Sequence, residues 1–541
     1  MTLDSDIEEL GSAARSAVIL SIGDFIYNAI LAFSYIVVIR LLGSEGYGLY
    51  NLVLSIPLLL YSFASLSIDT AISRYIKFYL AKKMVYKTKK VIKVSLYIKI
   101  LTGFLTTALC FIFPKSLAEI IINRPNAYNY VILASTIALL HSLYTYLLSV
   151  FVGLDEVWVN SVLKIAYSIS RVITVVPLLL MGFYVEGAIV SHIISLILAV
   201  LIGVISLTAI LKRKTDVNIS KEITDQNSIA KELVVYSIPL HTSSLLTTAL
   251  SMYQTMLLSR ALTDAEIGGY RALIVFQTFI TVILGPITIA LLPMFTGINA
   301  KGSKEDLIRA LTKSNKYVAL IVVPLTLITM VFSRELVYLI CGPDYLFAYI
   351  YLPLLFAPYL LVGFGSATIP QLFNAIGETK INLYVSLISS AIFVPISYLL
   401  TITLGYRLWG FLISSLISSI SSVVFYNIFL AKTFNDKVDI NTLNSVYVSS
   451  LLALLMPAVL LYIPLPKPIS LIRVVLGGVL FMLGYITFSV MFKALNEQDI
   501  EFFEKAFKTI PILETVIVLL ALFAKKLMKT LDRFSSKNKF S

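Results

Sequence analysis

Long runs of apolar residues, separated by short polar stretches, extend along nearly the whole chain. A helix that crosses a lipid bilayer needs about 20 mostly apolar residues. By that rule the pattern predicts about fourteen spanning helices, at 16–42, 48–76, 91–113, 128–152, 157–181, 184–211, 232–259, 268–296, 314–333, 345–372, 379–404, 407–431, 443–463 and 469–492. We therefore expect an all-α membrane protein, because spanning helices satisfy their own backbone hydrogen bonds.

Short segments of the first half of the chain recur in the second half in the same order. The matching positions are Arg40 and Arg260, Leu42 and Leu262, Gly48 and Gly268, Tyr50 and Tyr270, Glu156 and Glu378, Asn160 and Asn382, Gly182 and Gly405, Gly187 and Gly410, Ser191 and Ser414, and Ser195 and Ser418. The offset stays between 220 and 223 residues, which indicates two homologous halves of six spans each. Six is even, so both halves keep one orientation, as in a parallel transporter repeat.

These patterns divide the chain into consecutive parts. They are a cytoplasmic N-terminal tail at 1–15, a first lobe at 16–211, a cytoplasmic linker at 212–231, a second lobe at 232–431, helices 13 and 14 within 443–492, and a cytoplasmic tail at 493–541. The apolar run in the last part, 515–524, is too short to span and favours an amphipathic helix on the membrane surface. A fifteenth span is the alternative.

Composition supports a lipid environment for all of these helices. Of 541 residues, 58% are hydrophobic and only 13% are charged, whereas soluble domains carry about 25% charged residues. The net charge of +13 comes from Lys and Arg in the short loops. With the N-terminus inside, cytoplasmic loops and tails hold about thirty of them and outer loops about seven, which predicts cytoplasmic N- and C-termini. The charge therefore predicts the membrane topology of the chain, and we expect no nucleic-acid partner.

The loop from Lys77 to Lys93 carries seven lysines. They are typical of a topology anchor on the cytoplasmic side. Contact with anionic lipid headgroups is the second interpretation.

Three segments carry a resemblance to a known family. They are Leu-Gly-Ser-Glu-Gly-Tyr-Gly-Leu-Tyr at 42–50, Ser-Leu-Ser-Ile-Asp-Thr-Ala-Ile-Ser-Arg-Tyr-Ile at 65–76 and Gly-Glu-Thr-Lys-Ile-Asn at 377–382. With the span count and the repeat, residues 10–495 resemble polysaccharide and oligosaccharide flippases of the O-antigen-translocase type, within the multidrug/oligosaccharidyl-lipid/polysaccharide exporter superfamily. The resemblance implies two six-helix lobes around a central cavity, alternating access, and a lipid-tail groove at helices 13 and 14.

The implied function is translocation of a polyprenyl-(pyro)phosphate-linked oligosaccharide across the cytoplasmic membrane, for assembly of surface polysaccharide or glycoprotein glycans. Expected partners are this substrate, membrane lipids and polysaccharide-assembly enzymes, and the fold needs no second copy, so a monomer is expected. The sequence has no G-x-x-x-x-G-K-[ST] loop and no His/Cys cluster, so we expect no enzyme activity, cofactor or metal site.

Three alternatives stay open from sequence. The first is a cation-coupled multidrug exporter of the same fold. The second is a membrane glycosyltransferase that would use outer acids such as Glu119 or Asp344. The third is a structural partner of a glycan-export complex that transports nothing itself.

Two basic residues in the fifth span are the first candidates for substrate binding. Arg171 lies deep in the span, and Lys164 lies seven residues earlier on the same helical face, with Asn160 and Tyr167. A charge in a bilayer centre is costly and needs a partner or water. The four residues could form a basic track for a phosphate headgroup. Pairing with carboxylates, or snorkelling of Lys164 to the interface, is the other interpretation.

Polar stripes in other spans add candidate contacts for sugars. The residues are Asn28 and Tyr35 in span 1, His141 in span 4, His241, Ser244, Thr248, Ser251 and Thr255 in span 7, and Asn51, Ser55, Ser62, Ser65 and Asp69 in span 2. In the resembled fold, spans 1, 2 and 7 line the cavity. Helix–helix packing explains such stripes equally well.

Five charged residues are candidates for gating or coupling: Asp24, Asp69, Arg74, Arg260 and Arg271. Arg74 could pair with Asp69 or Asp24 to close an inner gate, and Asp24 could instead hold a coupling cation. Arg260 and Arg271 lie at the outer ends of spans 7 and 8, where they could meet the headgroup, close an outer gate or snorkel.

Overall fold

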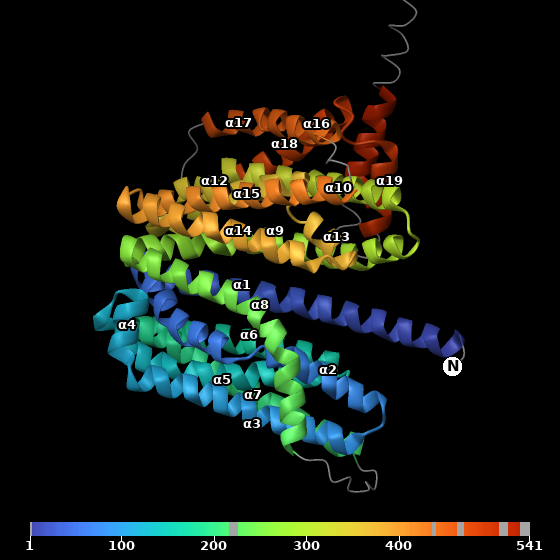
Figure 1. Ribbon diagram of the computed structural model, residues 1–541. Coiled ribbons are helices and arrows are strands. Elements are labelled where there is room, and N and C mark those ends of the chain that lie inside the picture. The colour runs from blue at the N-terminus through green and yellow to red at the C-terminus, as the bar shows by residue number, and fades with distance from the viewer. Residues whose placement is uncertain (1–2, 216–225, 435–439, 463–469, 508–517, 531–541) are drawn as a thin grey trace, which may run out of the picture. The chain divides into compact units, whose positions relative to one another are not determined.

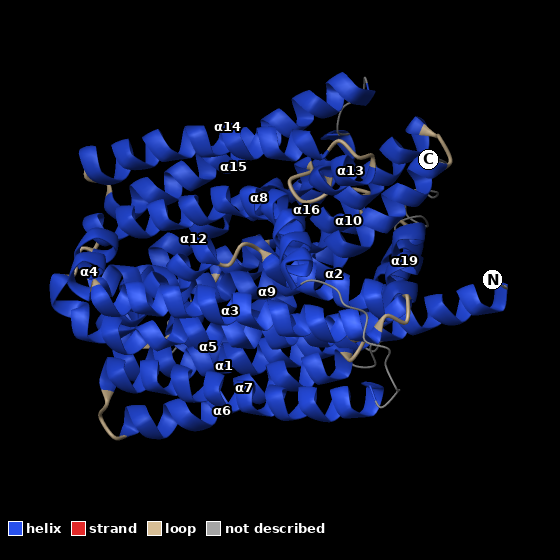
Figure 2. Ribbon diagram, turned by 60° about the horizontal axis from the view of Figure 1, so that its bottom comes forward, coloured by secondary structure: helices blue, strands red, loops and turns tan. Residues whose placement is uncertain are grey.

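The computed structural model describes residues 3–215, 226–434, 440–462, 470–507 and 518–530, and all regular structure in these ranges is helical (Figures 1 and 2). The expected all-α membrane fold is confirmed. The chain forms two compact units, Met1–Val275 and Phe276–Ser541.

Eleven helices of the described residues are long and apolar enough to span a membrane, and a bent helix pair within 229–261 makes a twelfth. The first of them, Gly23–Ala64, is two helices joined at Gly43, whose φ of 67° and ψ of 177° turn the chain sharply. A shorter apolar segment, Leu443–Val459, accounts for the predicted helix 13. The structure thus accommodates the predicted set of about fourteen spans.

Unit 1 contains ten elements (Figure 1). They are α1 (Leu3–Ala64), α2 (Ile68–Ala81), α3 (Val85–Ile112), α4 (Pro114–Ile122), η1 (Pro125–Ala127), α5 (Tyr128–Gly153), α6 (Val157–Leu180), α7 (Tyr184–Thr215), α8 (Gln226–Ala261) and the first turns of α9 (Asp264–Ala300). Neighbouring helices pack in the order α3, α5, α7, α6 and α1. Half of the predicted linker, residues 216–225, falls between α7 and α8, and this half lies outside the described residues.

The predicted continuous span 48–76 is wrong in one respect, because the helix breaks inside it. The first segment ends at Ala64 and α2 begins at Ile68. Between them Leu66 and Ser67 have φ values of 51° and 49°, a conformation that side-chain-bearing residues rarely adopt. The break frees backbone groups in an apolar region, so polar side chains must satisfy them.

Unit 2 continues α9 and adds the remaining elements. They are α10 (Lys304–Val331), α11 (Ser333–Ile340), η2 (Pro343–Tyr351), α12 (Leu352–Phe356), η3 (Ala357–Phe364), α13 (Ile369–Ala375), α14 (Thr379–Tyr398), the π-helical η4 (Leu399–Thr403), α15 (Arg407–Phe434), α16 (Ile440–Ala453), α17 (Leu455–Tyr462), α18 (Ser470–Met491), α19 (Glu497–Phe507) and a helix over 518–530. A core cluster of Phe295, Leu311, Phe373 and Leu430 joins α9, α10, α13 and α15.

The predicted span 345–372 is not one continuous α-helix. It consists of 3-10 segments around a short α-helix, and Gly365 then takes a φ of 89°. Pro353 and Pro358 lie within it. Proline lacks the backbone donor that an α-helix needs, so the regular hydrogen-bond ladder stops at these positions.

Equivalent positions of the sequence repeat have equivalent geometry. Gly182 and Gly405 both have positive φ, at 87° and 71°. The Asn160 side-chain amide donates to the Leu148 carbonyl at 3.0 Å, and that of Asn382 donates to Pro370 at 3.1 Å. Each amide thus bonds to the residue twelve positions earlier, which supports the two homologous halves inferred from the sequence.

A buried ion pair joins the C-terminal tail to the rest of unit 2. The Lys316 ammonium on α10 lies 2.5 Å from Asp499 of α19, and their side chains are 11% and 5% exposed. Asp499 also caps its own helix by exchanging hydrogen bonds with Asn496. Phe502 stacks on Tyr317 at 4.4 Å between ring centroids. The tail is therefore an integral part of this unit.

We expect Asp499→Ala to destabilise the protein by about 3–5 kcal/mol, because Lys316 would remain buried without a partner. The measurement is the thermal unfolding midpoint of the full chain in detergent. The double variant Lys316→Met/Asp499→Leu removes both charges and should recover most of the loss. An unchanged midpoint for Asp499→Ala would contradict a structural role for the pair.

Candidate functional site

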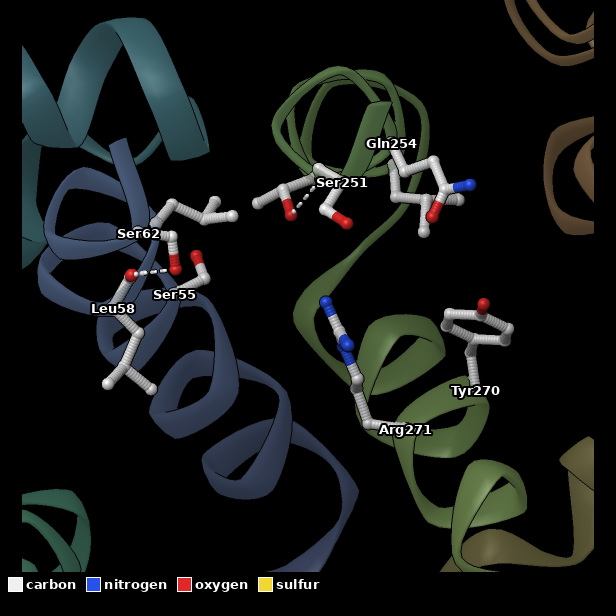
Figure 3. Close-up of a pocket in the computed structure, with 10 residues that line it drawn as sticks. Ser55, Leu58, Ser62, Ser251, Gln254, Tyr270 and Arg271 are labelled. Carbon is white, nitrogen blue, oxygen red and sulfur yellow. Dashed lines mark hydrogen bonds between the residues drawn. The ribbon is translucent and has the colours of Figure 1, made fainter. Parts of the chain in front are cut away.

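One pocket of unit 1 combines a cation with several hydroxyl groups (Figure 3). It has a volume of about 250 Å³ and lies between the second helical segment of α1, the C-terminal half of α8 and the start of α9. Its lining residues are Ser55, Leu58, Leu59, Ser62, Ser251, Gln254, Thr255, Leu258, Tyr270 and Arg271. We call it the Arg271 pocket. Four of its residues, Ser55, Ser62, Ser251 and Thr255, belong to the polar stripes of spans 2 and 7.

Arg271 is the cation of this pocket. Figure 3 shows its side chain extending from α9 into the space between α1 and α8. The Arg271 Nε atom is buried and has no hydrogen-bond partner, and the guanidinium carbon lies 6.0 Å from the ring centroid of Tyr270. Within the described part of the chain, no carboxylate forms an ion pair with it. A half-buried guanidinium of this kind is suited to binding an anion.

The hydroxyl groups of the pocket complement this cation. Ser55, Ser62 and Thr255 donate to carbonyls of their own helices at 2.6, 2.9 and 3.0 Å. Their protons are therefore engaged, while their oxygen lone pairs can accept hydrogen bonds from a ligand. Sugar hydroxyls are donors of this kind. The pocket can thus bind an anionic group at Arg271 and hydroxyl groups beside it.

Close backbone contacts hold the α9 wall of the pocket in position. A Cβ atom on Gly48 would lie 1.8 Å from the Asp264 carbonyl oxygen, and one on Gly268 would lie equally close to Ser44. Glycine is required at both positions because the two backbones touch there.

Two arginines stabilise the turn before α9 through hydrogen bonds and an ion pair. Arg124 pairs with Asp264 at 2.8 Å and donates to the Ser259 and Leu262 carbonyls, each at 3.0 Å. Arg260 donates to the Ile120 carbonyl at 2.7 Å. The guanidinium of Arg260 thus binds the backbone of α4 beside this turn.

A buried lysine that the sequence reading overlooked neutralises Asp69. The Lys99 side chain on α3 is fully buried, and its ammonium lies 2.7 Å from Asp69 and 2.8 Å from the Tyr61 hydroxyl. Ser149 donates to the other Asp69 oxygen at 3.1 Å. His141 meets the Tyr61 ring edge-on at 5.5 Å. In the sequence, Lys99 can be recognised as a lysine near the middle of the predicted span 91–113.

In this conformation Arg74 does not pair with Asp69 or Asp24, so its predicted role in an inner gate stays a prediction. Both acids have other cationic partners: Asp69 pairs with Lys99 and Asp24 pairs with Lys164, each at 2.7 Å. The Arg74 guanidinium instead lies over the ring of Tyr236, 4.2 Å from its centroid. This cation–π contact joins α2 to α8 within unit 1.

His241 forms hydrogen bonds with groups at the helix break between α1 and α2. Its Nε2 donates to the Phe63 carbonyl at 3.1 Å, which leaves Nδ1 to accept from the Ser67 hydroxyl at 3.3 Å. Ser244 reaches the same hydroxyl at 3.0 Å. Around this point α8 itself bends by 51°. Two interrupted helices therefore meet at a polar contact, as helices do at transporter sites.

Arg171 is enclosed by tyrosines. The residue is 1% exposed, its guanidinium donates to the Tyr50 hydroxyl, and its central carbon lies 5.6 Å from the Tyr35 ring centroid. Its Nε and Nη1 atoms have no hydrogen-bond partner. One turn away, Tyr167 bonds to His192 at 3.1 Å. In this conformation the guanidinium has no open face.

The four residues predicted as one basic track thus have separate partners. Lys164 pairs with Asp24, Asn160 bonds to backbone, Tyr167 bonds to His192, and Arg171 bonds to Tyr50. Asn28 is half-buried on α1. Roles in substrate binding for these residues remain predictions.

Comparison with protein families gives two matches. Residues 13–299, more than half of the chain, match the family described as polysaccharide biosynthesis protein. Residues 239–399 match the MatE family. No curated protein matches the chain.

Solved structures share the fold over most of the chain. A lipid II flippase, MurJ, in an inward closed conformation has a TM-score of 0.69 at 14% identity and covers 87% of this chain and 99% of its own. An inward-facing multidrug-resistance MATE transporter has a TM-score of 0.61 at 16% identity, covering 77% and 98%. A Pyrococcus furiosus transporter of the MOP superfamily, whose title reports reversed polarity of the binding pocket, has a TM-score of 0.52 at 16% identity, covering 78% and 96%. These identities show the fold alone.

Solvent access should distinguish Arg271 from Arg171. The two free cysteines, Cys110 and Cys341, are buried and can be replaced by serine. In that background we expect Arg271→Cys to react with a charged, water-soluble thiol reagent in membranes, because the pocket is open to polar molecules. Arg171→Cys should stay unmodified, and Arg309→Cys, whose native side chain is 72% exposed, serves as the fully labelled control. Equal labelling of both test variants would show that the tyrosine enclosure opens readily.

Proposed function

Because the chain belongs to the polysaccharide biosynthesis protein family, we propose that it flips a polyprenyl-phosphate- or polyprenyl-pyrophosphate-linked oligosaccharide across the cytoplasmic membrane. The movement is from the inner to the outer leaflet by alternating access, and it supplies a surface polysaccharide or a protein-linked glycan. Both termini lie in the cytoplasm in this proposal. Helices α16 to α18 serve as the groove for the lipid tail.

The Arg271 pocket is the observation that supports this substrate class most directly. A lipid-linked oligosaccharide combines a phosphate with many hydroxyl groups, and the pocket offers a guanidinium that pairs with no carboxylate of the described residues, beside serine and threonine oxygens. Guanidinium groups bind phosphate oxygens with two parallel hydrogen bonds. We therefore propose Arg271 as the headgroup contact of this conformation. Contact of the headgroup with Arg171 and Lys164 in another conformation stays a prediction.

The second candidate is cation-coupled drug export on the same fold, which the MatE match over 239–399 favours. A cationic drug would be attracted by a free carboxylate in its pathway and repelled by a free guanidinium. In unit 1, Asp24 and Asp69 are both paired with lysines, whereas Arg271 has no carboxylate partner among the described residues. This charge pattern supports an anionic substrate.

Removal of the Arg271 charge should impair flipping strongly. We expect Arg271→Ala to lower the initial rate about tenfold to a hundredfold, because a charge-assisted hydrogen bond contributes about 1.5–3 kcal/mol. Arg271→Lys should keep part of the activity. The assay uses proteoliposomes with a labelled polyprenyl-linked oligosaccharide and follows its protection from an added glycan-cleaving enzyme.

The matched control for this assay is Arg309→Ala, which removes an exposed positive charge far from the pocket in sequence. It should flip at the wild-type rate. Full activity of a folded Arg271→Ala protein would reject the pocket but keep the function. Absence of flipping by the wild type, together with cation-driven dye efflux, would favour the drug exporter.

An inside-negative membrane potential should accelerate outward flipping, since it assists an anion by about 2.3 kcal/mol per charge for each 100 mV. A potassium diffusion potential set with valinomycin, with Na⁺ and H⁺ equal on both sides, tests this directly. Flux that ignores the potential and requires a Na⁺ or H⁺ gradient would contradict potential-driven uniport.

A further inference from the structure

We infer that one face of α3 binds an anionic phospholipid of the membrane, with the headgroup at lysines near the start of the helix and an acyl chain along the residues that follow. The inference goes beyond the proposed function, because this lipid is bound and not transported. It selects headgroup contact, the second interpretation of the lysine-rich loop from Lys77 to Lys93. The residues of the face are Tyr86, Lys90, Lys93, Tyr97, Leu101 and Phe104, and we call them the α3 lipid face.

The six residues lie on one side of the helix. Successive members are four, three, four, four and three residues apart, and an α-helix completes a turn every 3.6 residues. The Lys90 ammonium lies 5.5 Å from the ring centroid of Tyr86, and the Lys93 ammonium lies 5.9 Å from that of Tyr97. These cation–π contacts favour conformations in which both ammonium groups stay on this side of α3.

Beyond the lysines the face is largely apolar and exposed. Tyr97, Leu101 and Phe104 are 56%, 57% and 58% exposed. Ser95 and Thr102, on the opposite side of α3, are buried. Because α3 is one of the helices that are long and apolar enough to span the membrane, an exposed apolar strip on it contacts lipid acyl chains. A lipid whose chain follows this strip brings its headgroup to the two lysines.

The lysines at this end of α3 carry positive charge that no described carboxylate neutralises. Within the described residues, Lys77 is the one lysine of the loop that forms an ion pair, with Asp155 at 2.8 Å. The chain has no Asp or Glu between Asp69 and Glu119. The lysines without such a partner are Lys82, Lys83, Lys87, Lys89, Lys90 and Lys93. Ammonium groups of this kind attract phosphate oxygens.

Carboxylates of neighbouring helices at this end of unit 1 bind other groups. Glu156 pairs with Arg213 at 2.8 Å, and Glu232 accepts a hydrogen bond from the Tyr79 hydroxyl at 2.7 Å. In the proposed topology this end faces the cytoplasm, where the adjoining leaflet carries anionic lipids. The charge of the loop and the charge of that leaflet are therefore complementary.

A signal for membrane topology does not by itself explain this loop. Orientation depends on the number of Lys and Arg residues, and Asp and Glu contribute little. The corresponding loop of the second half, 297–316, carries five Lys and Arg residues together with Glu305 and Asp306. These acids lie 3.7 and 3.8 Å from Arg309. The second half thus combines a topology signal with acids, whereas the loop of the first half excludes acids, which favours binding of an anion.

The turn before α3 has a lysine where the corresponding turn of the second half has a glycine. Lys83 has a φ of 57°, and Gly302, 219 residues later, has a φ of 75°. Glycine adopts this left-handed conformation without a steric penalty, whereas a residue with a side chain does not. A requirement for positive charge in the loop explains why a lysine occupies this position.

The test measures lipid preference with a tryptophan placed on the α3 lipid face. Tyr97→Trp is made in the full chain after the two native tryptophans, Trp158 and Trp409, are replaced by phenylalanine. The protein is reconstituted into phosphatidylcholine bilayers that contain rising fractions of dibrominated phosphatidylglycerol or dibrominated phosphatidylcholine, whose acyl chains quench tryptophan on contact. Quenching should show a preference for phosphatidylglycerol of at least about fivefold, the factor that one lysine near an anionic surface supplies.

Charge-removal variants provide the decisive comparison. Replacement of Lys87, Lys89, Lys90 and Lys93 by glutamine should lower the preference to about one, because these residues supply most of the charge beside the probe. The matched control replaces Lys301, Lys304, Arg309 and Lys313, four exposed cations of the second half, by glutamine. This control should keep the preference of the protein with all its lysines.

A salt titration tests the same attraction without any lysine substitution. Raising the ionic strength from about 0.05 M to about 0.5 M screens exposed charges and should lower the preference for phosphatidylglycerol several-fold. Inorganic phosphate, compared at equal ionic strength, should not displace the brominated lipid, because it has no acyl chain to contact Leu101 and Phe104.

Several outcomes would overturn the lipid site. They are equal quenching by both lipids, absence of quenching by either, a preference that survives the four glutamines, and an equal loss in the control variant. Displacement of the lipid by inorganic phosphate would assign the lysines to a soluble anion and would also overturn it. Transport is not part of the readout, so each of these results leaves the proposed function intact.

Discussion

The need to compensate charge in an apolar environment determines much of the interior of this protein. A buried cation without a partner costs several kcal/mol, and the described spans meet this requirement with specific pairs: Lys99 with Asp69, Lys164 with Asp24, and Arg473 with Glu335. The Lys316–Asp499 pair extends the same rule to the C-terminal tail. Each pair joins different helices, so neutralisation of charge also fixes which helices are neighbours.

Backbone polarity follows the same rule at the break between α1 and α2. A helix that stops within a span exposes carbonyl and amide groups that lipid cannot satisfy. Here the imidazole of His241 and the hydroxyl of Ser244 reach this break from α8, which itself bends nearby. Asp69 lies in the first turn of α2, directly beyond the break, and draws Lys99 towards it. A strained turn, a histidine and an ion pair thus form one connected polar region within unit 1.

The sequence predicted most of the fold, because spans and repeats are local or periodic patterns. The hydroxyl stripes of spans 2 and 7 also predicted much of the lining of the Arg271 pocket. It did not predict the partners of charged residues: Lys99 was overlooked, and Arg74 was expected to pair with acids that have other partners. An ion pair depends on which helices are adjacent and which faces they turn to each other, and periodicity within one helix carries no such information. The break at Leu66 and Ser67 was missed because no proline or glycine marks it.

Pairing also explains why depth in a span does not identify the arginine that a ligand can reach in this conformation. Arg171 lies deeper in its predicted span than Arg271, yet depth is what required its enclosure by Tyr35 and Tyr50. Arg271 lies near the start of α9, where a half-buried guanidinium can remain solvated and needs no permanent partner. A cation that is stable without a protein counter-ion, yet can be desolvated by a ligand, is able to bind and release an anion in each cycle. Under the proposed function, the sign of this charge, which pairs with no carboxylate of the described residues, separates an exporter of cations from a carrier of phosphate-linked glycans more clearly than the shared fold does.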